Sequence, residues 1–540
     1  MKECCVCVSL WILTAASGAI LPDSRPPYEN RTFHSFAVDA YIEEWAPKIA
    51  DANLSVLFSN CLPNTLDTTV LFSDGREDTF VVTGDISALW LRDSTNQVMP
   101  YMRFASTDSD LADMLCGLLR RQARSVLLDP YANAFNFDDS EPLGHQDDTR
   151  SPPMTWGLFE GKYELDSLGA FLKLASAYFN ATQDASCFNF NFNLTHANDD
   201  GNQRSSGGSG VGGSGSGGGG AEETSARSLR QRRRRLRGEG SSSSSSSRTG
   251  SWFDALAAAL DVVEWNLQGT QAEEVFAAKA AGTAKAGSGV ADDRGGDLEW
   301  QQQPSYRFSR DTDVCTDTLF SGGRGPPAAD ATGLSKSYFR PSDDASSLPF
   351  LVPANAMVLV ELVKIHGLTT ALAADAAAAA ANTTTTPAKI RGLGLRALLL
   401  AATIEEGLWT HAVDPTTKRI AYEVDGFGSR LYMDDANIPS LLSLPYLGLL
   451  DLPNHRYKPL LSLPATNEPP SAAAASAPSA VAAAVAEAGD NLSSRLRWEP
   501  SSSPSFSGVV CFAPLLRRLK SQAESFEGGV EGVEEGGVGA

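Results

Sequence analysis

The stretch from Thr83 to Tyr101 places charged residues inside an apolar and aromatic run, with Arg92 and Asp93 close behind Trp90. Burying such charges is costly unless they are paired or bind a ligand. A guanidinium and a carboxylate can bind sugar hydroxyls by charge-assisted hydrogen bonds, while an indole covers the apolar face of a sugar ring. The pattern therefore predicts either a sugar site or, more simply, a helix start with one internal ion pair, because charge clusters mark sites only probabilistically.

Two further segments carry adjacent acids ahead of apolar runs, namely Asp343 with Asp344 and Asp434 with Asp435. Neighbouring carboxylates raise each other's proton affinity, which can keep a general acid protonated near neutral pH. The structural alternative for the first pair is an N-cap of the helix expected to begin near Pro353, or a solvated turn.

Two polar stretches lie between these segments. Residues 131–140 have no helical spacing and predict a loop, the kind of element that often carries function. Residues 156–167 are expected to begin a helix that runs to Tyr178, with Lys162 and Glu164 near its start. Acids at that position also complement the dipole of a helix, which is the simpler interpretation.

The elements that would position these residues are mainly helices. Apolar residues recur at helical spacing in six segments: 36–60, 110–128, 156–178, 252–267, 356–365 and 395–408. Residues 69–82 alternate well enough for a strand or hairpin. Because four acid-bearing segments each precede or join a helix, we expect repeated helical hairpins that aim their loops at one common face.

Composition narrows the classes of function. The chain has 540 residues, 42% of them hydrophobic, and a formal net charge of -21. The negative charge argues against nucleic acid as a general partner. After the N-terminus we expect no membrane span. The six His are scattered and no HExxH motif occurs, so a metal site built from His or Cys is not expected.

The N-terminus reads as a signal peptide at residues 1–19, with an apolar core and a small-residue cleavage site; a buried segment or a short anchor is the alternative. A secreted or lumenal protein is therefore predicted. Six Asn-x-Ser/Thr sequons support this, at Asn30, Asn53, Asn180, Asn193, Asn382 and Asn491. Removing the leader would leave an odd number of cysteines: Cys61, Cys116, Cys187, Cys315 and Cys511.

Several segments have low complexity. Residues 199–250 combine a Gly/Ser tract, a run of Arg at 230–237 and a Ser run, which predicts a flexible insertion without a core. The Arg run could bind polyanions or be a processing site, but a solvated segment is the default. Residues 269–300 and an Ala/Thr-rich stretch around 370–386 are also expected to lie outside regular structure.

Six motifs together resemble glycoside hydrolase family 125. They are TGDISALWLRDSTNQVMPY, YANAFN, KYELDSLGAFLKLA, FRPSDDA with VPANAM, YEVDGFG, and MDDANIPSLLSLPYLG, in family order from about residue 36 to 450. The resemblance implies an exo-acting, metal-independent, inverting α-1,6-mannosidase on an all-α, (α/α)6 toroid of helical hairpins. It implies no cofactor, and a mannose-containing oligosaccharide or N-glycan as the partner.

The resemblance also implies roles for individual residues. Inverting glycosidases use two carboxyl groups about 6.5–9.5 Å apart, one as general acid and one as general base. The general acid falls in FRPSDDA and is therefore Asp343 or Asp344. Substrate-binding residues are implied at seven positions: Arg92, Asp93, Asn133, Lys162, Glu164, Asp434 and Asp435.

The sequence departs from the family pattern after Gly448. Residues 451–540 are rich in Pro, Ala, Ser, Gly and Glu, and no family-type segment with a general base is found; Glu524 in AESFEGG is not assigned to that role. We therefore expect a catalytic domain over 36–450 whose toroid is incomplete at its C-terminal end. Two functions follow: an α-mannosidase, or a catalytically impaired mannoside-binding homologue or truncated gene product.

Overall fold

The computed structural model describes residues 21–73, 77–195, 247–271, 305–378 and 385–452. The predicted leader, most of the predicted insertion and the region from residue 453 onward lie outside these ranges, as do Asn382, Asn491, Cys511 and Glu524.

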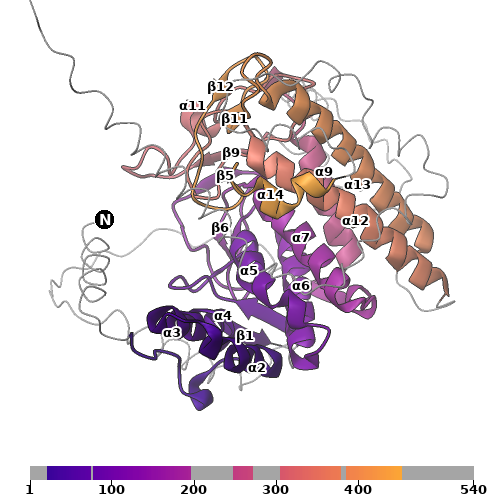
Figure 1. Cartoon of the computed structure of the whole chain (residues 1–540). Helices are drawn as coiled ribbons and strands as arrows, with labels where there is room; N and C mark the ends of the chain where they lie inside the picture. Colours follow the sequence, from indigo (N-terminus) through magenta and orange to yellow (C-terminus); the bar gives the residue numbers. More distant parts are fainter. Residues whose placement is uncertain (1–20, 74–76, 196–246, 272–304, 379–384, 453–540) are drawn as a thin grey trace, which may run out of the picture.

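Helices make up the body of the described chain, in agreement with the all-α expectation (Figure 1). The α-helices are α2 (Phe36–Trp45), α3 (Ala52–Cys61), α4 (Asn64–Thr68), α5 (Leu91–Val98), α6 (Ser109–Leu128), α7 (Leu165–Thr182), α9 (Trp252–Trp265), α11 (Phe320–Gly323), α12 (Val352–Ala378), α13 (Pro387–Gly407) and α14 (Leu444–Leu447). Short 3-10 or π segments are η1 (Tyr28–Asn30), η2 (Ala46–Lys48), η4 (Met99–Phe104), η5 (Ser186–Phe188), η7 (Leu408–Ala412) and η8 (Leu449–Asp451).

The strands are short and lie in the connections between helices. They are β1 (Val70–Ser73), β2 (Asp78–Val81), β3 (Leu89–Trp90), β4 (Ala134–Phe135), β5 (Thr149–Ser151), β6 (Leu158–Glu160), β7 (Asn191–Thr195), β8 (Ser247–Ser251), β9 (Arg307–Ser309), β10 (Phe350–Leu351), β11 (Glu423–Val424) and β12 (Arg430–Leu431). They pair antiparallel as β1–β2, β3–β4–β6, β5–β9, β7–β8 and β10–β11–β12. The hairpin predicted within 69–82 is confirmed as β1–β2.

Local sequence signals explain where the main helices begin. Asp108 is the N-cap of α6, since its carboxylate accepts a hydrogen bond from the Leu111 N–H at 3.0 Å. Ser251 and Asp254 form a reciprocal capping box at the start of α9. The helices predicted at 110–128 and 252–267 are therefore confirmed to within a few residues.

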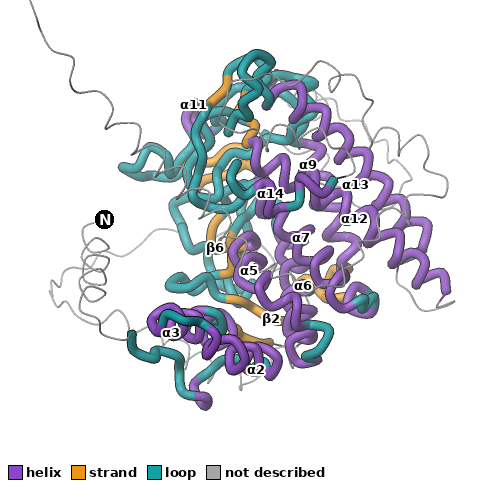
Figure 2. The backbone as a smooth tube through the Cα atoms, in the orientation of Figure 1, coloured by secondary structure: helices purple, strands orange, loops and turns teal. Residues whose placement is uncertain are grey.

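Helices α5, α7 and α12 pack in succession, as do α6, α9 and α13, and the two rows meet where α6 contacts α7 and α13 contacts α12 (Figure 1). Helix α7 is buried along nearly its whole length. Gly169 allows α7 to approach α12 closely, because a Cβ at this position would lie 3.2 Å from a Val358 methyl group. Loops and short strands gather at one side of this helical layer (Figure 2), as the acid-bearing loops were expected to do.

Helix α12 differs from the sequence expectation in two ways. It continues to Ala378, because its run of alanines has high helix propensity, so the stretch around 370–386 is not wholly an irregular insertion. By length and composition alone α12 could also span a membrane. Most of it is buried instead against α7 and α13, which is the packing of a core helix.

The predicted start of α7 was wrong by several residues. Residues 158–160 form β6, and the helix begins only at Leu165, after Glu164 in extended conformation. Successive side chains of an extended segment point to opposite sides, so Glu160, Lys162 and Glu164 share one side. The extended conformation of this segment therefore brings the three charged side chains together in the site described below.

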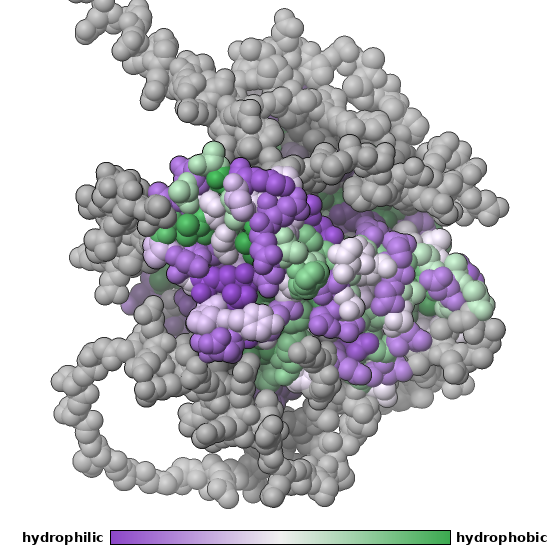
Figure 3. Space-filling view, turned by 60° about the horizontal axis from the view of Figure 1, so that its bottom comes forward, coloured by the Kyte–Doolittle hydropathy of each residue, from purple (hydrophilic) through white to green (hydrophobic). Residues whose placement is uncertain are grey.

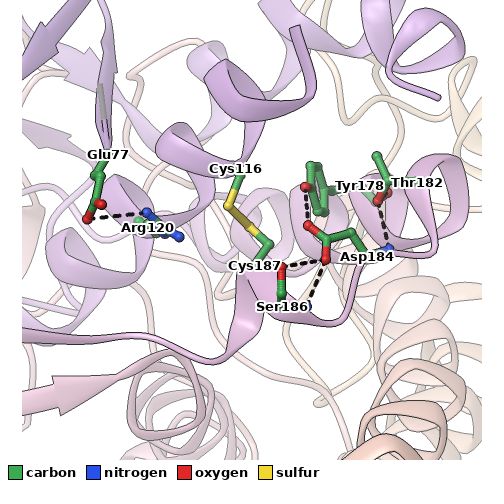
Figure 4. The surroundings of a disulfide bond; sticks show 8 residues. All are labelled: Glu77, Cys116, Arg120, Tyr178, Thr182, Asp184, Ser186 and Cys187. Carbon is green, nitrogen blue, oxygen red and sulfur yellow. Dashed lines mark hydrogen bonds and ion pairs between the residues drawn. A yellow bond between two sulfur atoms is a disulfide. The ribbon is translucent and has the colours of Figure 1, made fainter. Parts of the chain in front are cut away.

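The predicted C-terminal boundary of the insertion at 199–250 was also wrong, by four residues. Its last four residues belong to β8, which pairs with β7 from Asn191↔Ser251 to Thr195↔Ser247. Backbone hydrogen bonds rather than side-chain pattern define this strand, so composition could not reveal it. Beside the hairpin, a disulfide joins Cys116 of α6 to Cys187 of η5 (Figure 4), while Cys61 and Cys315 are free and exposed.

On the face seen in Figure 3, described residues of both kinds are exposed, and hydrophilic and hydrophobic areas are interspersed. Among the described residues, the larger hydrophobic core cluster draws on α2, α5, α6, α7, α9, α12 and α13 and on the segments next to them.

Candidate active site

Five segments that are distant in the sequence meet around one buried guanidinium. They are the start of α5, the loop before β4, the segment from the end of β6 to the start of α7, the turn at residues 340–345 and Tyr422 just before β11. Ion pairs and hydrogen bonds connect these residues, except Tyr422, which interacts electrostatically with Asp166. We call this group the charged cluster: Arg92, Asp93, Asn133, Glu160, Lys162, Glu164, Asp166, Asp343 and Tyr422.

Arg92 is the centre of the charged cluster. Its Nη1 contacts the Glu164 carboxylate and lies 3.3 Å from Asp166 Oδ2, and its Nη2 lies 3.1 Å from Asp93 Oδ2. Burial alone would lower the pKa of the guanidinium, but the surrounding carboxylates more than offset this and raise it. The ion pair that the sequence predicted between Arg92 and Asp93 is thus confirmed, within a larger group of acids.

Two cations, Arg92 and Lys162, share the cluster with five acids, and this excess of acids favours protons on some of the carboxyl groups. Burial, followed by the charges of Asp166, Asp343 and Glu160, raises the pKa of Glu164 well above its ordinary value, although Arg92 opposes the rise. Burial likewise raises the pKa of Asp166 to about 6, against the effect of Arg92. The charged cluster is therefore able to hold and exchange protons near neutral pH.

The turn at residues 340–345 distinguishes the two candidate acids. Asp343 has a positive φ of 67°, and burial together with the charge of Glu160 raises the pKa of its carboxyl group. The neighbouring Glu164 carboxyl group opposes this rise, as do the charges of Lys162 and Arg92. The Asp344 carboxylate instead accepts a hydrogen bond from Ser342 Oγ at 2.9 Å. Asp343 is the member of the pair that belongs to the charged cluster.

A second network of charges borders Glu160. Arg310 donates to Glu160 at 2.8 Å and to both oxygens of Asp148 at 2.7 Å. Lys162 donates to Asp317 at 2.7 Å and lies 3.5 Å from Glu160. Asn133 Nδ2 bridges Glu160 and Glu164, at 2.9 and 3.2 Å.

Five buried polar atoms of the charged cluster have no hydrogen-bond partner within the described part of the chain. One is Asp93 Oδ2, which is ion-paired with Arg92, and the others are Asn133 Oδ1, Asp166 Oδ1, Asp343 Oδ1 and the Tyr422 hydroxyl. Buried polar atoms are normally paired, so each such atom calls for an explanation. Acceptor oxygens and a hydroxyl group within one buried cluster suit a ligand that carries several hydroxyl groups.

The other predicted acids lie at the edge of this arrangement. Asp434 accepts hydrogen bonds from the backbone N–H groups of Leu441 and Leu442, at 2.8 and 3.0 Å, and so organises the loop ahead of α14. Asp435 accepts from the Asn437 N–H at 3.0 Å and acts electrostatically on Tyr422. Trp90 is buried and packs on Phe159, with ring centroids 5.3 Å apart.

Sequence reasoning missed Glu160, Arg310, Asp317 and Tyr422 as site residues. The signal for Glu160 was present, because Glu160, Lys162 and Glu164 recur every second residue, a strand-like spacing. Arg310 and Asp317 follow a long stretch without a clear sequence pattern, and Tyr422 stands out only as the first residue of the motif YEVDGFG.

A cavity of about 340 Å³ lies elsewhere, beside α6 and the β1–β2 hairpin. Its lining residues are Phe33, Phe72, Glu77, Asp110, Asp113, Met114, Cys116 and Arg120, some of which appear in Figure 4. None of them belongs to the charged cluster. Within the described ranges, no group of three or more His, Cys, Asp or Glu side chains is arranged to hold a metal ion.

Comparison with known proteins identifies the family. The family described as metal-independent alpha-mannosidase (GH125) matches residues 51–198 and 242–462. The meiotically up-regulated gene 157 protein of Schizosaccharomyces pombe is 34% identical over 443 residues, which is 80% of this chain and 67% of that protein. The match of 51–198 and 242–462 spans the whole charged cluster.

A solved structure from Streptococcus pneumoniae is similar with a TM-score of 0.52 and 28% identity, over 79% of this chain and 76% of that one. It is described as a metal-independent alpha mannosidase in a non-productive complex with alpha-1,6-mannobiose. The expected (α/α)6 fold is confirmed by this likeness and by the mainly helical body. The chain belongs to glycoside hydrolase family 125, the metal-independent alpha-mannosidases, and is a glycosidase by descent.

Proposed function

We propose that the protein releases terminal α-1,6-linked mannose by an inverting mechanism, with Asp343 as the general acid. The substrate class follows from the α-1,6-mannobiose bound by the similar Streptococcus structure. A mannose-containing oligosaccharide or N-glycan is the proposed partner. The further proposal, inversion, follows from the family resemblance drawn above.

The observation that carries this proposal is the environment of Asp343. A general acid must hold a proton at the working pH and must present it to the leaving oxygen. Burial and the negative charge of Glu160 favour the proton on Asp343, and its Oδ1 has no partner among the described residues. Asp344 lies outside the charged cluster, and its Oδ2 accepts a hydrogen bond from Ser342.

Mannose hydroxyls would complete the charged cluster. Asn133 Oδ1 and Asp166 Oδ1 can each accept a hydrogen bond from a hydroxyl group, and the Tyr422 hydroxyl can donate one. Arg92 and Asp93 supply charge-assisted contacts, which are stronger than neutral ones. In this arrangement Glu164 and Arg92 fix the geometry as well as binding sugar, because both are already engaged with neighbouring side chains.

The test is Asp343→Asn with Asp344→Asn as its matched control. Loss of a general acid typically lowers turnover by about 10²–10⁴-fold, so Asp343→Asn should lose most hydrolysis of α-1,6-mannobiose while Asp344→Asn keeps it. A dinitrophenyl α-mannoside has a leaving group that needs little protonation, and Asp343→Asn should affect it far less. Equal losses on both substrates, or a larger loss in Asp344→Asn, would refute the assignment.

Two measurements separate turnover from binding. Proton NMR identifies the anomer of mannose that is released first, and the β anomer would show inversion. Calorimetric titration with α-1,6-mannobiose measures affinity directly. Since no family-type base segment is found in the sequence, slow turnover together with normal affinity would favour the catalytically impaired, mannoside-binding alternative.

We also propose that the protein folds in the secretory pathway. The Cys116–Cys187 disulfide supports this, because such bonds form and persist in oxidising compartments. Asn30 and Asn180, within two of the sequons, are exposed. Secretion from a eukaryotic host, followed by endoglycosidase treatment, should give a mass shift that Asn30→Gln with Asn180→Gln reduces. An intracellular, unshifted product would contradict the proposal.

A further inference from the structure

We propose that Lys162 is a positioning residue that holds the turn of Asp343 in place, rather than a ligand of mannose. The inference rests on the proposed role of Asp343 as the general acid. It gives a separate role to a side chain that the family resemblance places in the substrate site.

The ammonium group of Lys162 is engaged by contacts within the protein and is not free to bind a sugar. Its ammonium group has three donors. One hydrogen bond goes to Asp317 Oδ1 at 2.7 Å and one to the Asp343 backbone carbonyl at 3.0 Å, while Glu160 Oε1 lies 3.5 Å away. The side chain is only 1% exposed, and its ammonium lies over the ring of Phe339.

The backbone of Asp343 needs such a support. Its φ of 67° lies in the left-handed region, which residues other than glycine adopt uncommonly. The Lys162 ammonium binds its carbonyl from one side. On the other side the Asp343 N–H donates to the Arg340 carbonyl at 3.0 Å, and the Arg340 N–H donates to the Asp344 carbonyl at 2.8 Å.

Arg340 is itself fixed. Its Nε donates to Glu423 Oε1 at 2.6 Å, and the other oxygen of Glu423 accepts the backbone N–H groups of Ser347 and Leu348 at 3.0 and 2.8 Å. The turn is therefore clamped between Lys162 from the β6 segment and Glu423 from β11. Such preorganisation matters, because a displacement of about 1 Å can cost roughly 10²-fold in rate.

The same ammonium sets the charge that Asp343 senses. Four ionisable groups face this carboxyl group: Glu160, Lys162, Glu164 and Arg92. Burial alone would raise the pKa of Glu160, but Lys162, Asn133 and Arg310 hold it below its ordinary value, so Glu160 stays negative. Glu160 thus favours the proton on Asp343 and Lys162 opposes it.

This opposition gives a test in which two neighbouring substitutions act in opposite directions. The variants are Lys162→Met and Glu160→Gln, with Lys364→Met as the matched control, since Lys364 forms an ion pair with Glu361 outside the charged cluster. The readouts are the alkaline limb of the kcat profile, the titration of Asp343 by carbon-13 NMR of aspartate-labelled protein, and mannobiose affinity by calorimetry. The signal of Asp343 is identified by its absence from Asp343→Asn.

We expect Lys162→Met to lower kcat by about 10–100-fold, to move the titration of Asp343 and the alkaline limb to higher pH, and to change mannobiose affinity little. Glu160→Gln should move both to lower pH. Lys162→Arg keeps the charge but not the donor geometry, so it should lower kcat without shifting the titration of Asp343. If Lys162→Met does not fold, the Lys162→Arg variant alone tests the positioning role. Lys364→Met should change none of these quantities.

Two results would overturn the positioning role. Weaker affinity with unchanged kcat and unchanged Asp343 titration would make Lys162 a sugar ligand, and unchanged values throughout would leave it without a role in the site. The NMR and affinity measurements hold even where turnover is slow. If Asp343→Asn itself keeps full turnover, the proposed function fails instead, which is a distinguishable outcome.

Discussion

Arg92 and Arg121 are both buried, and their surroundings differ in one respect. Arg121 on α6 donates through Nε to Asp78 Oδ1 at 2.7 Å, through Nη2 to Asp78 Oδ2, and through Nη1 to the Phe137 carbonyl at 3.2 Å. Ser73 Oγ also donates to Asp78, at 2.8 Å. Every oxygen of Asp78 has a partner. Around Arg92, by contrast, both Asp166 and Asn133 keep a buried oxygen that has none among the described residues.

The difference separates a structural ion pair from a binding site. A buried pair whose hydrogen bonds are complete fixes two elements, here α6 and β2, and has nothing to gain from a ligand. The buried Arg92 is shared among three acids, Asp93, Glu164 and Asp166, so some acceptor oxygens remain available to a ligand. This arrangement lies where the connections between several helices converge.

Removing each arginine should give the largest contrast. Arg92→Met and Arg121→Met each leave buried carboxylates uncompensated, so each should lower the free energy of unfolding by roughly 3–5 kcal/mol. Only Arg92→Met should also abolish mannobiose binding in calorimetry, measured below its unfolding temperature. If folded Arg121→Met loses affinity to the same extent, the distinction between the two regions is wrong.

A smaller effect is expected in the pH dependence of stability. The pKa of Asp166 is about 6 in the folded protein, because burial raises it from an ordinary value of 3.8. Between these values the folded protein binds the proton more tightly than the unfolded chain does. Its contribution to stability is therefore fully present below the ordinary value and is lost as the pH rises through about 6, by at most about 3 kcal/mol.

Asp166→Asn should flatten this dependence. The measurement is urea unfolding of wild type and variant at several pH values between about 4 and 7, with the disulfide intact. The difference between the two curves isolates Asp166 from the other titrating groups. If the wild type instead becomes more stable relative to Asp166→Asn as the pH rises through 6, the prediction is contradicted.

The smallest contrast uses two buried tyrosines. The Tyr422 hydroxyl has no partner among the described residues, whereas the Tyr306 hydroxyl accepts from the Tyr163 N–H and donates to the Gly161 carbonyl, both at 2.9 Å. Tyr422→Phe should weaken mannobiose binding by about 0.5–1.5 kcal/mol and leave the unfolding temperature unchanged. Tyr306→Phe should destabilise the fold by about 1–3 kcal/mol, because it leaves a buried N–H unpaired. Equal unfolding temperatures for Tyr422→Phe and Tyr306→Phe would contradict the distinction between the two hydroxyl groups.

Much of this architecture was predictable from local pattern. The apolar stripe of α6, the capping acids and the Arg92–Asp93 pair all depend on residues near one another in the sequence. The paired acids at 343 and 344 could be recognised as candidates, but only the backbone turn shows which of them meets Glu160 and Glu164. Asp434 and Asp435 have the same sequence signature, yet Asp434 serves a loop.

What the sequence could not reveal depends on distant pairing. Glu160 acquires its role from Arg310, 150 residues away, and Arg340 from Glu423, 83 residues away. The segment before α7 was misjudged because acids near an apolar run suit a helix start equally well. Once β4 pairs with β6, the same residues become one side of an extended strand, and their charges face the site together.

The pairing of β7 with β8 has a practical consequence for engineering. Thr195 and Ser247 are partners across the ladder, so the framework is already joined at that point, whatever length of chain connects them. A reporter domain or an affinity tag could replace residues 199–246 without stretching the frame, since surface connections accept long insertions at small entropic expense. The same replacement extended to residue 250 would remove most of β8, and with it the lead into the capping box of α9. Whether residues 247–250 are kept therefore decides whether an insertion is tolerated or the start of α9 is destabilised.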